Sequence, residues 1–148
     1  NEFFLETDIP VVVCRFFNAF GPNETNPHLI PEIQQQVLEG KRVIKLGNLT
    51  PKRDFIHTYD MAAAVETLLT HVEGGIHTYN LGRGIEYSVT EIVDAFSKAI
   101  NEKIEIEVDQ TRVRKVERQH LLADVSKLKS LGWTPKIGIE DGIKTLVQ

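Results

Sequence analysis

One nearly unbroken apolar segment, residues 9–17, constrains the fold of this chain more than any other. It reads Ile-Pro-Val-Val-Val-Cys-Arg-Phe-Phe, and most of its side chains are β-branched or aromatic. A run of this kind is typical of a strand that is buried on both faces of a parallel sheet. Because such a strand needs neighbouring strands and covering helices, the segment predicts an α/β fold.

The segment that follows, residues 18–23, favours a turn because it contains Gly21 and Pro22. In open α/β sheets, ligands bind at the carboxyl ends of the strands. Polar side chains in this segment are therefore candidates for a binding site, and Asn18 is the first of them. Its amide could contact a ligand or stabilise its own turn, and the residues alone favour the turn.

The rest of the chain alternates between helical and strand-like patterns. Helices are predicted over residues 29–39, 61–71, 88–100, 124–132 and 139–147, and short strands over residues 43–46, 77–81 and 104–108. Asp60 is predicted to cap its helix, and Ser88 with Glu91 fits a capping box. Residues 1–7 look like the last turns of a helix. With short connections and no internal repeat, the pattern predicts one domain.

Composition limits the partners and the location of the protein. Lys and Arg number 17 against 21 Asp and Glu, for a formal net charge of -4, so binding to the phosphates of a long nucleic acid is not expected. No apolar run approaches the roughly 20 residues that cross a bilayer, and no secretion signal opens the chain. The sequence therefore predicts a soluble, cytoplasmic protein that binds neither nucleic acid nor membrane.

Several familiar catalytic motifs are absent from the sequence. No Gly-x-Gly-x-x-Gly turn or phosphate-binding loop stands between a strand and a helix. The five histidines lack the spacing of zinc ligands, and no Gly-x-Ser-x-Gly elbow is present. A complete dinucleotide-binding fold, a metal site and a serine hydrolase are therefore not predicted.

Arginines beside turns are the remaining candidates for chemistry. Arg53 could fork onto two phosphate oxygens while the neighbouring carboxylate of Asp54 holds it, and a solvated Arg53–Asp54 pair is the alternative. A second group places four cations within seven residues, which indicates either a local anion site or a solvated basic loop: Arg112, Arg114, Lys115 and Arg118.

A series of short motifs, each weak alone, runs through the whole chain. They are RFFNAFGP at 15–22, LIP at 29–31, GN at 47–48, RDFIHTYDMA at 53–62, YNLGRG at 79–84, SV at 88–89, AFSK at 95–98, RxxE at 114–117, ADxSK at 123–127 and LGWxP at 131–135. In this order and spacing they resemble the extended short-chain dehydrogenase/reductase family. Within it, they resemble the carboxyl-terminal, substrate-binding portion of the NAD-dependent nucleotide-sugar epimerases and dehydratases.

The resemblance implies a fold and a domain assignment. Residues 1–148 would comprise one or two strands of a Rossmann sheet plus a small mixed α/β substrate-binding domain. The family's Gly-rich NAD-binding domain, and the catalytic Tyr-x-x-x-Lys before the strand at residues 9–17, have no counterpart in this sequence. We therefore expect a carboxyl-terminal fragment without catalytic residues, of an enzyme whose NAD is bound mainly by the amino-terminal domain.

The resemblance also assigns roles around the phosphates. Asn18, Arg53 and Arg114 match family residues that contact the diphosphate of the nucleotide sugar. His28 and Leu29 match residues that touch the nucleotide at the start of a helix, whose amino end favours an anion.

Other positions match family residues around the base and the cofactor. Ile44 and Leu46 would supply apolar contacts to the base. Glu117 would orient the second phosphate-binding arginine or meet a ribose hydroxyl. Phe16 and Phe17 would approach the nicotinamide cofactor.

The resulting hypothesis is the substrate-binding half of an NAD-dependent nucleotide-sugar 4,6-dehydratase or 4-epimerase. The run GNLTPKRD, residues 47–54, looks slightly more like the dehydratases. A non-catalytic nucleotide-sugar-binding or interaction module is the alternative, because the catalytic pair is missing. An apolar strand without its upstream neighbours leaves an exposed edge, so we expect a homodimer or association with the amino-terminal half.

Overall fold

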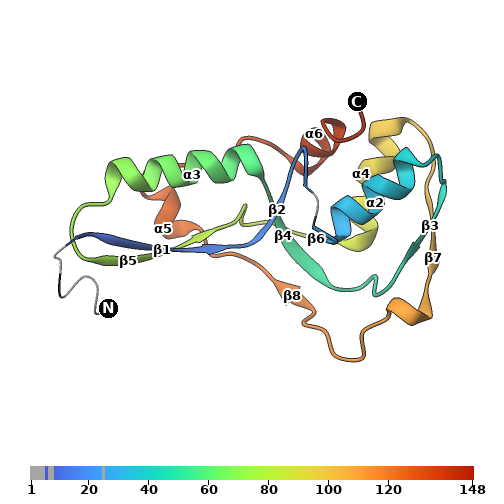
Figure 1. Ribbon diagram of the computed structural model, residues 1–148, viewed down its shortest axis with the longest axis horizontal. Coiled ribbons are helices and arrows are strands. Elements are labelled where there is room, and N and C mark those ends of the chain that lie inside the picture. The colour runs from blue at the N-terminus through green and yellow to red at the C-terminus, as the bar shows by residue number, and fades with distance from the viewer. Residues whose placement is uncertain (1–5, 7–8, 25) are drawn as a thin grey trace.

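Three small sheets run through the described part of the protein, with helices packed beside and between them (Figure 1). The computed structural model describes residue 6, residues 9–24 and residues 26–148. The helix end predicted over residues 1–7 therefore lies outside the described residues, apart from Glu6. No helix in the described ranges is long and apolar enough to cross a lipid bilayer. The predicted α/β fold is confirmed.

The first sheet pairs β1 (Val11–Phe16) with β5 (Ile76–Leu81) in parallel. The helices α3 (Thr58–His71) and α5 (Ser126–Lys129) lie beside this pair at one end of the molecule (Figure 1). Buried side chains of these elements and their neighbours form one of two core clusters: Ile56, Ala64, Leu68, Tyr79, Leu81, Leu128 and Trp133.

The prediction that β1 is buried on both faces is wrong. Val13 is 45% exposed and Phe16 is 58% exposed. In the part of the chain that the structure describes, β1 pairs with β5 alone, so one edge of the strand and part of its surface stay uncovered. The predicted exposed edge is therefore observed.

The central sheet is built around β4 (Lys52–His57). Three short strands pair with it: β2 (Asn18–Phe20) and β8 (His120–Leu121) in parallel, and β6 (Glu86–Ser88) antiparallel. A single residue, Phe17, separates β1 from β2, so the chain passes directly from the first sheet into the central one. Asn18 accordingly begins a strand, opposite Phe55, and not the turn that the residues alone favour.

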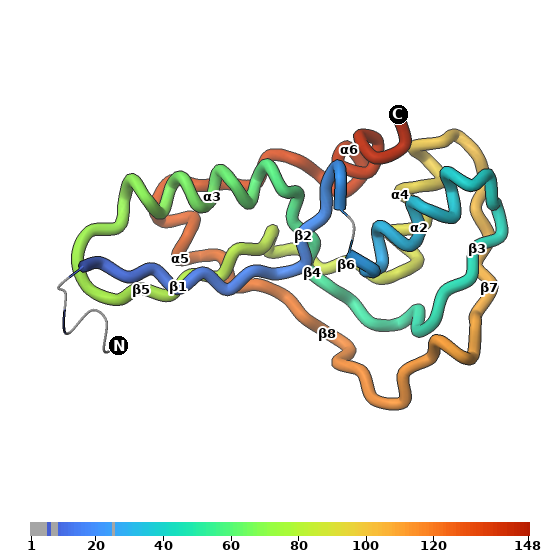
Figure 2. Tube along the Cα trace, in the orientation of Figure 1, coloured from blue at the N-terminus to red at the C-terminus, as the bar shows by residue number. Residues whose placement is uncertain are grey.

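The third sheet pairs β3 (Val43–Leu46) with β7 (Glu105–Val108) in parallel. Three helices contribute to the larger core cluster beside it: α2 (Leu29–Leu38), α4 (Val89–Ile100) and α6 (Ile139–Lys144). After β7, the short 3-10 helix η1 (Gln110–Arg112) begins a loop that returns along the outside of the molecule to β8 (Figure 2).

Local capping signals are confirmed at one helix and corrected at another. At α4, Ser88 and Glu91 form the predicted capping box. At α3 the cap is His57, whose Nδ1 accepts a hydrogen bond from the amide of Tyr59 at 3.3 Å. Asp60 lies inside the first turn, is buried, and accepts hydrogen bonds from the backbone amides of residues 136 and 137.

Candidate functional site

A cavity of about 360 Å³ lies where the start of α2, the end of β3, β4 and the loop from β7 to β8 approach one another. Seven of the eight residues predicted to bind substrate line it: Asn18, His28, Leu29, Leu46, Arg53, Arg114 and Glu117. These residues are scattered along the sequence. The fold therefore brings together, in one cavity, side chains that the sequence had indicated only as separate candidates.

Ile44 is the predicted substrate-binding residue that does not line the cavity. Its side chain is 0% exposed and belongs to the larger core cluster. Ile44 and Leu46 face the same side of β3, because alternate residues of a strand share a face. Leu46, at the carboxyl end of the strand, reaches the cavity, whereas Ile44 is covered by core side chains. Ile44 therefore supports the core and does not form the cavity wall.

Arg53 is held in the cavity wall by two hydrogen bonds. Nη2 donates to Oε1 of Glu117 at 3.1 Å, and Nη1 donates to the carbonyl oxygen of Lys52 at 2.8 Å. Both side chains of the ion pair are mostly buried, at 19% exposure for Arg53 and 18% for Glu117. Glu117 therefore orients Arg53, and the prediction that it orients Arg114 is corrected.

Asp54 does not hold Arg53, although it follows it in the sequence. Successive residues of a strand point to opposite faces, so the Asp54 carboxylate turns away from the cavity and is 0% exposed. It accepts hydrogen bonds from the backbone amides of Arg83 at 2.7 Å, Gly84 at 2.8 Å and Ala123 at 3.2 Å. Burial raises the pKa of Asp54, and the three amide donors oppose that rise. Asp54 thus joins two loops behind the site.

The basic loop after β7 divides into paired and unpaired cations. Arg112 donates from Nη1 to Oε1 of Glu32 at 2.8 Å, and its Nε lies 3.3 Å from Oδ2 of Asp109. The exposed side chain of Arg114 lines the cavity without an ion pair or hydrogen bond within the described residues. Lys115 and Arg118 are exposed and lie outside the cavity lining.

The cavity wall carries an excess of positive charge in an acidic chain. It contains three arginines and two carboxylates, at positions 53, 112, 114, 32 and 117, whereas the whole chain has a formal net charge of -4. Two of the arginines pair with the two carboxylates. The Arg114 guanidinium remains, together with the Asn18 amide and the His28 ring, neither of which has a side-chain partner in the described residues. These three groups are available to a ligand.

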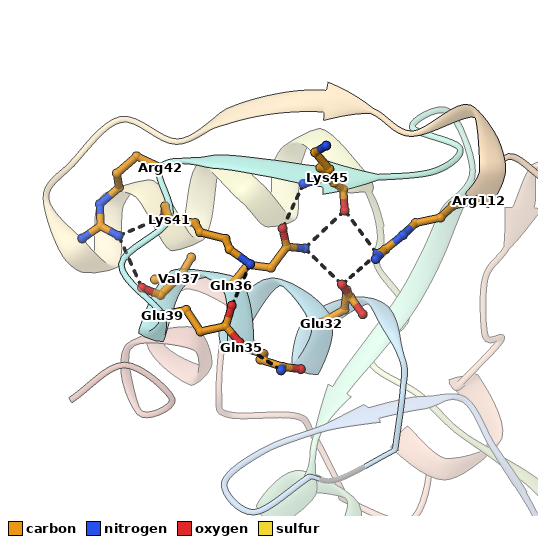
Figure 3. Close-up of polar contacts among 9 residues, drawn as sticks. All are labelled: Glu32, Gln35, Gln36, Val37, Glu39, Lys41, Arg42, Lys45 and Arg112. Atoms are coloured by element: carbon orange, nitrogen blue, oxygen red, sulfur yellow. Dashed lines mark hydrogen bonds and ion pairs between the residues drawn. The ribbon is translucent and has the colours of Figure 1, made fainter.

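A buried amide that the sequence did not reveal joins α2 to β3. Gln36 is 7% exposed. Its Nε2 donates to Oε1 of Glu32 at 3.1 Å and to the carbonyl oxygen of Lys45 at 3.2 Å, and its Oε1 accepts from the amide of Lys45 at 2.9 Å (Figure 3). Glu32 also meets Arg112 in this network (Figure 3). The helix that follows His28 is therefore held to the strand that ends at the cavity.

Three more residues of the wall were also missed by sequence reasoning. Phe55, Tyr87 and Val89 add apolar and aromatic surface to the cavity. Tyr87 lies opposite Arg53 in the antiparallel pairing of β4 with β6. The strand β6 is only three residues long, so no periodic pattern marks it. Its pairing with β4 therefore could not be predicted from the sequence.

A smaller cavity of about 290 Å³ adjoins the first and shares Asn18, His28 and Phe55 with it. Phe17, one of the two predicted cofactor contacts, lines this second cavity. Phe16, the other, lies at the carboxyl end of β1 with 58% of its surface exposed and lines neither cavity. The two phenylalanines therefore do not share one site within the described residues.

No group of three or more His, Cys, Asp or Glu side chains within the described ranges is arranged to hold a metal ion. The positive groups of the cavity instead suit an anion.

Comparison with known proteins shows which sequence family and which curated proteins this chain is similar to. Residues 2–146 match the family model described as GDP-mannose 4,6 dehydratase. GDP-L-fucose synthase 1 of Arabidopsis thaliana is 33% identical over 135 residues, which cover 85% of this chain and 41% of that protein. The chain thus spans less than half the length of this curated relative.

Solved structures share the fold over nearly the whole chain. UDP-glucose 4-epimerase from Bifidobacterium longum, in complex with NAD+ and UDP, superposes with a TM-score of 0.84 at 25% identity, over 99% of this chain and 49% of that one. RMD from Pseudomonas aeruginosa, complexed with NADPH, gives a TM-score of 0.87 at 24% identity, over 99% of this chain and 50% of that one.

Proposed function

We propose a function on the premise that this chain belongs to the GDP-mannose 4,6 dehydratase family, whose model matches residues 2–146. The chain is the substrate-binding half of an NAD-dependent nucleotide-sugar 4,6-dehydratase or 4-epimerase. Its cavity of about 360 Å³ holds the diphosphate and the base of the nucleotide sugar. The whole protein acts in the cytoplasm.

The observation that carries this proposal is the unbalanced positive charge of the cavity. A diphosphate presents oxygens that accept hydrogen bonds and that match the planar fork of a guanidinium. Arg53, fixed by Glu117, offers one such group, and Arg114 offers a second with no partner in the described residues. The amide of Asn18 adds a neutral donor beside them.

Other residues that line the same cavity suit a base and a ribose. Leu29, Leu46 and Tyr87 provide apolar or aromatic surface, on which a planar base can lie. Glu117 has a second carboxylate oxygen that no hydrogen bond occupies within the described residues. We assign that oxygen to a ribose hydroxyl, the second role that the family resemblance implies for it.

The proposed cofactor is NAD, bound mainly by an amino-terminal domain that precedes residue 1. When bound, NAD accepts and returns a hydride. Phe16 suits such a neighbour, because an aromatic side chain 58% exposed at the carboxyl end of a parallel strand leaves apolar surface to be covered. The free edge of β1 supports association with the same domain, or with a second copy of the chain.

Titration calorimetry of the chain with UDP, GDP, dTDP and CDP tests the binding proposal. We expect one nucleotide to bind more tightly than the others, and Arg53→Ala or Arg114→Ala to weaken it by about 10- to 100-fold, since a charged hydrogen bond contributes about 1.5–3 kcal/mol. Arg118→Ala is the matched control. It removes a cation from the same loop as Arg114 but outside the cavity lining.

Equal binding by the parent chain and both cavity variants would refute the assignment of the two arginines. A loss with Arg118→Ala as large as that with Arg114→Ala would show that general charge attraction, and not the cavity, carries the affinity. Circular dichroism of each variant establishes that the fold is retained.

A further inference from the structure

Arg114 lacks the side-chain anchors that fix the other arginines of the cavity. Arg53 is held by Glu117 and by a backbone carbonyl, and Arg112 by Glu32 and Asp109. The guanidinium of Arg114 has no partner within the described residues, and residues 113–119 form neither helix nor strand. The direction in which Arg114 points must therefore be set through its backbone.

One side chain satisfies both backbone hydrogen-bonding groups of Arg114. The Oδ1 atom of Asn48 accepts from the Arg114 amide at 2.7 Å, and the Nδ2 atom of Asn48 donates to the Arg114 carbonyl oxygen at 3.1 Å. The amide of Asn48 thus pairs with the loop much as a neighbouring strand would. Because both peptide groups flanking the Arg114 Cα are held, the Cα–Cβ direction of Arg114 is fixed as well.

Gly47 permits the close approach that this contact requires. A Cβ atom at position 47 would lie 2.5 Å from the carbonyl oxygen of Arg112 and 3.0 Å from its carbonyl carbon, which is closer than a real Cβ can come. The loop is also joined to the end of β3 by a hydrogen bond of 2.8 Å from the amide of Asp109 to the carbonyl oxygen of Leu46. Gly47 therefore provides the space and Asn48 the hydrogen bonds.

The other attachments of the loop act on residues on either side of Arg114, such as Arg112, which pairs with Glu32. Gln119 accepts a hydrogen bond at its carbonyl oxygen from the amide of Lys52 at 2.7 Å and contacts Thr50 through its side chain. Between positions 114 and 119, the Glu117–Arg53 pair is the only ion pair to another segment of the described chain. Asn48 is thus the attachment that acts on Arg114 itself.

We infer that Asn48 is a positioning residue for nucleotide binding, which holds the backbone of Arg114 so that its guanidinium faces the phosphates. This inference rests on the proposed function. Asn48 also lines the cavity. Each polar atom of its side chain is engaged by Arg114, and the second N–H of Nδ2 remains, so direct contact with the ligand is the alternative that a double-mutant cycle distinguishes.

A double-mutant cycle measured by titration calorimetry with the tightest-binding nucleotide tests this role. Asn48→Ala should weaken binding by about 10-fold. The reason is that the Arg114 backbone is no longer held, and the resulting loss of affinity is comparable to that of about one hydrogen bond. The double variant with Arg114→Ala should bind no more weakly than Arg114→Ala alone, because coupled residues are not additive. Hydrogen exchange of the Arg114 amide, followed by NMR without ligand, should be faster in Asn48→Ala.

Asn80→Ala is the matched control. Asn80 also joins two segments through its side-chain amide, which donates to the carbonyl oxygen of Asp124 at 3.0 Å, but it lies outside the cavity lining. This variant should lower the unfolding temperature and leave the nucleotide Kd unchanged.

Additive losses in the cycle would overturn the inference, because they would mean that Asn48 contacts the ligand itself. Unchanged binding by Asn48→Ala, or an equal loss with Asn80→Ala, would overturn it too. If the parent chain binds no nucleotide, the proposed function fails and the role of Arg114 fails with it. If the parent binds and Arg114→Ala weakens binding while Asn48→Ala does not, the positioning role alone fails.

Discussion

Replacement of Asp54 by alanine separates two interpretations of one carboxylate. If Asp54 held Arg53, the variant would lose nucleotide affinity. In the structure the carboxylate is 0% exposed and accepts backbone hydrogen bonds of 2.7, 2.8 and 3.2 Å from Arg83, Gly84 and Ala123. Asp54→Ala should therefore destabilise the fold and affect the binding of nucleotide only through that loss.

The magnitude follows from the number and length of these hydrogen bonds. Each hydrogen bond to a charged group contributes about 1.5–3 kcal/mol, and the two shorter ones alone give at least about 3 kcal/mol. The release of a buried carboxylate offsets part of the sum, since burial raises the pKa of Asp54 and so disfavours its charged form. The variant should lose about 3–5 kcal/mol of unfolding free energy, a large share of the 5–15 kcal/mol of a typical domain.

Urea denaturation followed by circular dichroism measures this loss. Asp124→Ala is the control, because Asp124 is exposed and accepts one backbone hydrogen bond, from Ser126 at 3.0 Å. Because solvent can replace this hydrogen bond, Asp124→Ala should destabilise the fold much less than Asp54→Ala does. A loss below about 1 kcal/mol for Asp54→Ala, or equal losses for the two variants, would refute the reasoning.

Three further predictions concern other parts of the molecule. Arg53→Lys keeps the charge but not the planar fork, so calorimetry should show about 10-fold weaker nucleotide binding, and parent-like affinity would contradict this. Gly82→Ala should lower the unfolding free energy, measured by urea denaturation, by about 1–3 kcal/mol, because the new Cβ would lie 2.5 Å from that of Ala123. In the control Gly138→Ala, the nearest contact of the new Cβ would be 3.8 Å, so the unfolding free energy should be nearly unchanged. Burial lowers the pKa of His57, so the unfolded state binds more protons and stability should fall as pH drops below about 6.5, by at most about 1.36 kcal/mol per pH unit. His57→Asn, which keeps a capping acceptor, should reduce that slope, and identical slopes would count against it.

Short motifs in the sequence were enough to predict the family and to select residues that meet in one cavity. The family resemblance nominated Asn18, Arg53 and Arg114, and all three line one cavity. The family itself is confirmed by the match over residues 2–146. Their shared place in one cavity follows from the fold, and their contacts with a nucleotide stay a prediction.

The sequence could not predict partners that depend on which segments meet in space. The sequence suggested that Asp54 pairs with its neighbour Arg53. In the structure, the pleat of β4 turns the Asp54 carboxylate towards loops about 30 and 70 positions away. Asn48 and Gln36 each join two segments through one side-chain amide, and no periodic pattern marks such a residue. The apolar pattern of β1 predicted burial on both faces, but Val13 and Phe16 are exposed, because within the described residues β1 pairs with β5 alone.

The single residue between β1 and β2 leaves no slack between the first and central sheets. One residue of extended chain spans at most about 3.3–3.6 Å, so β1 cannot slide along its axis without pulling Asn18, and with it one wall of both cavities. Any partner that packs against the free edge of β1 is therefore connected to the cavity through only a few residues of backbone. A displacement of β1 would therefore reach the cavity wall at Asn18 through Phe17 alone, without any loop between them.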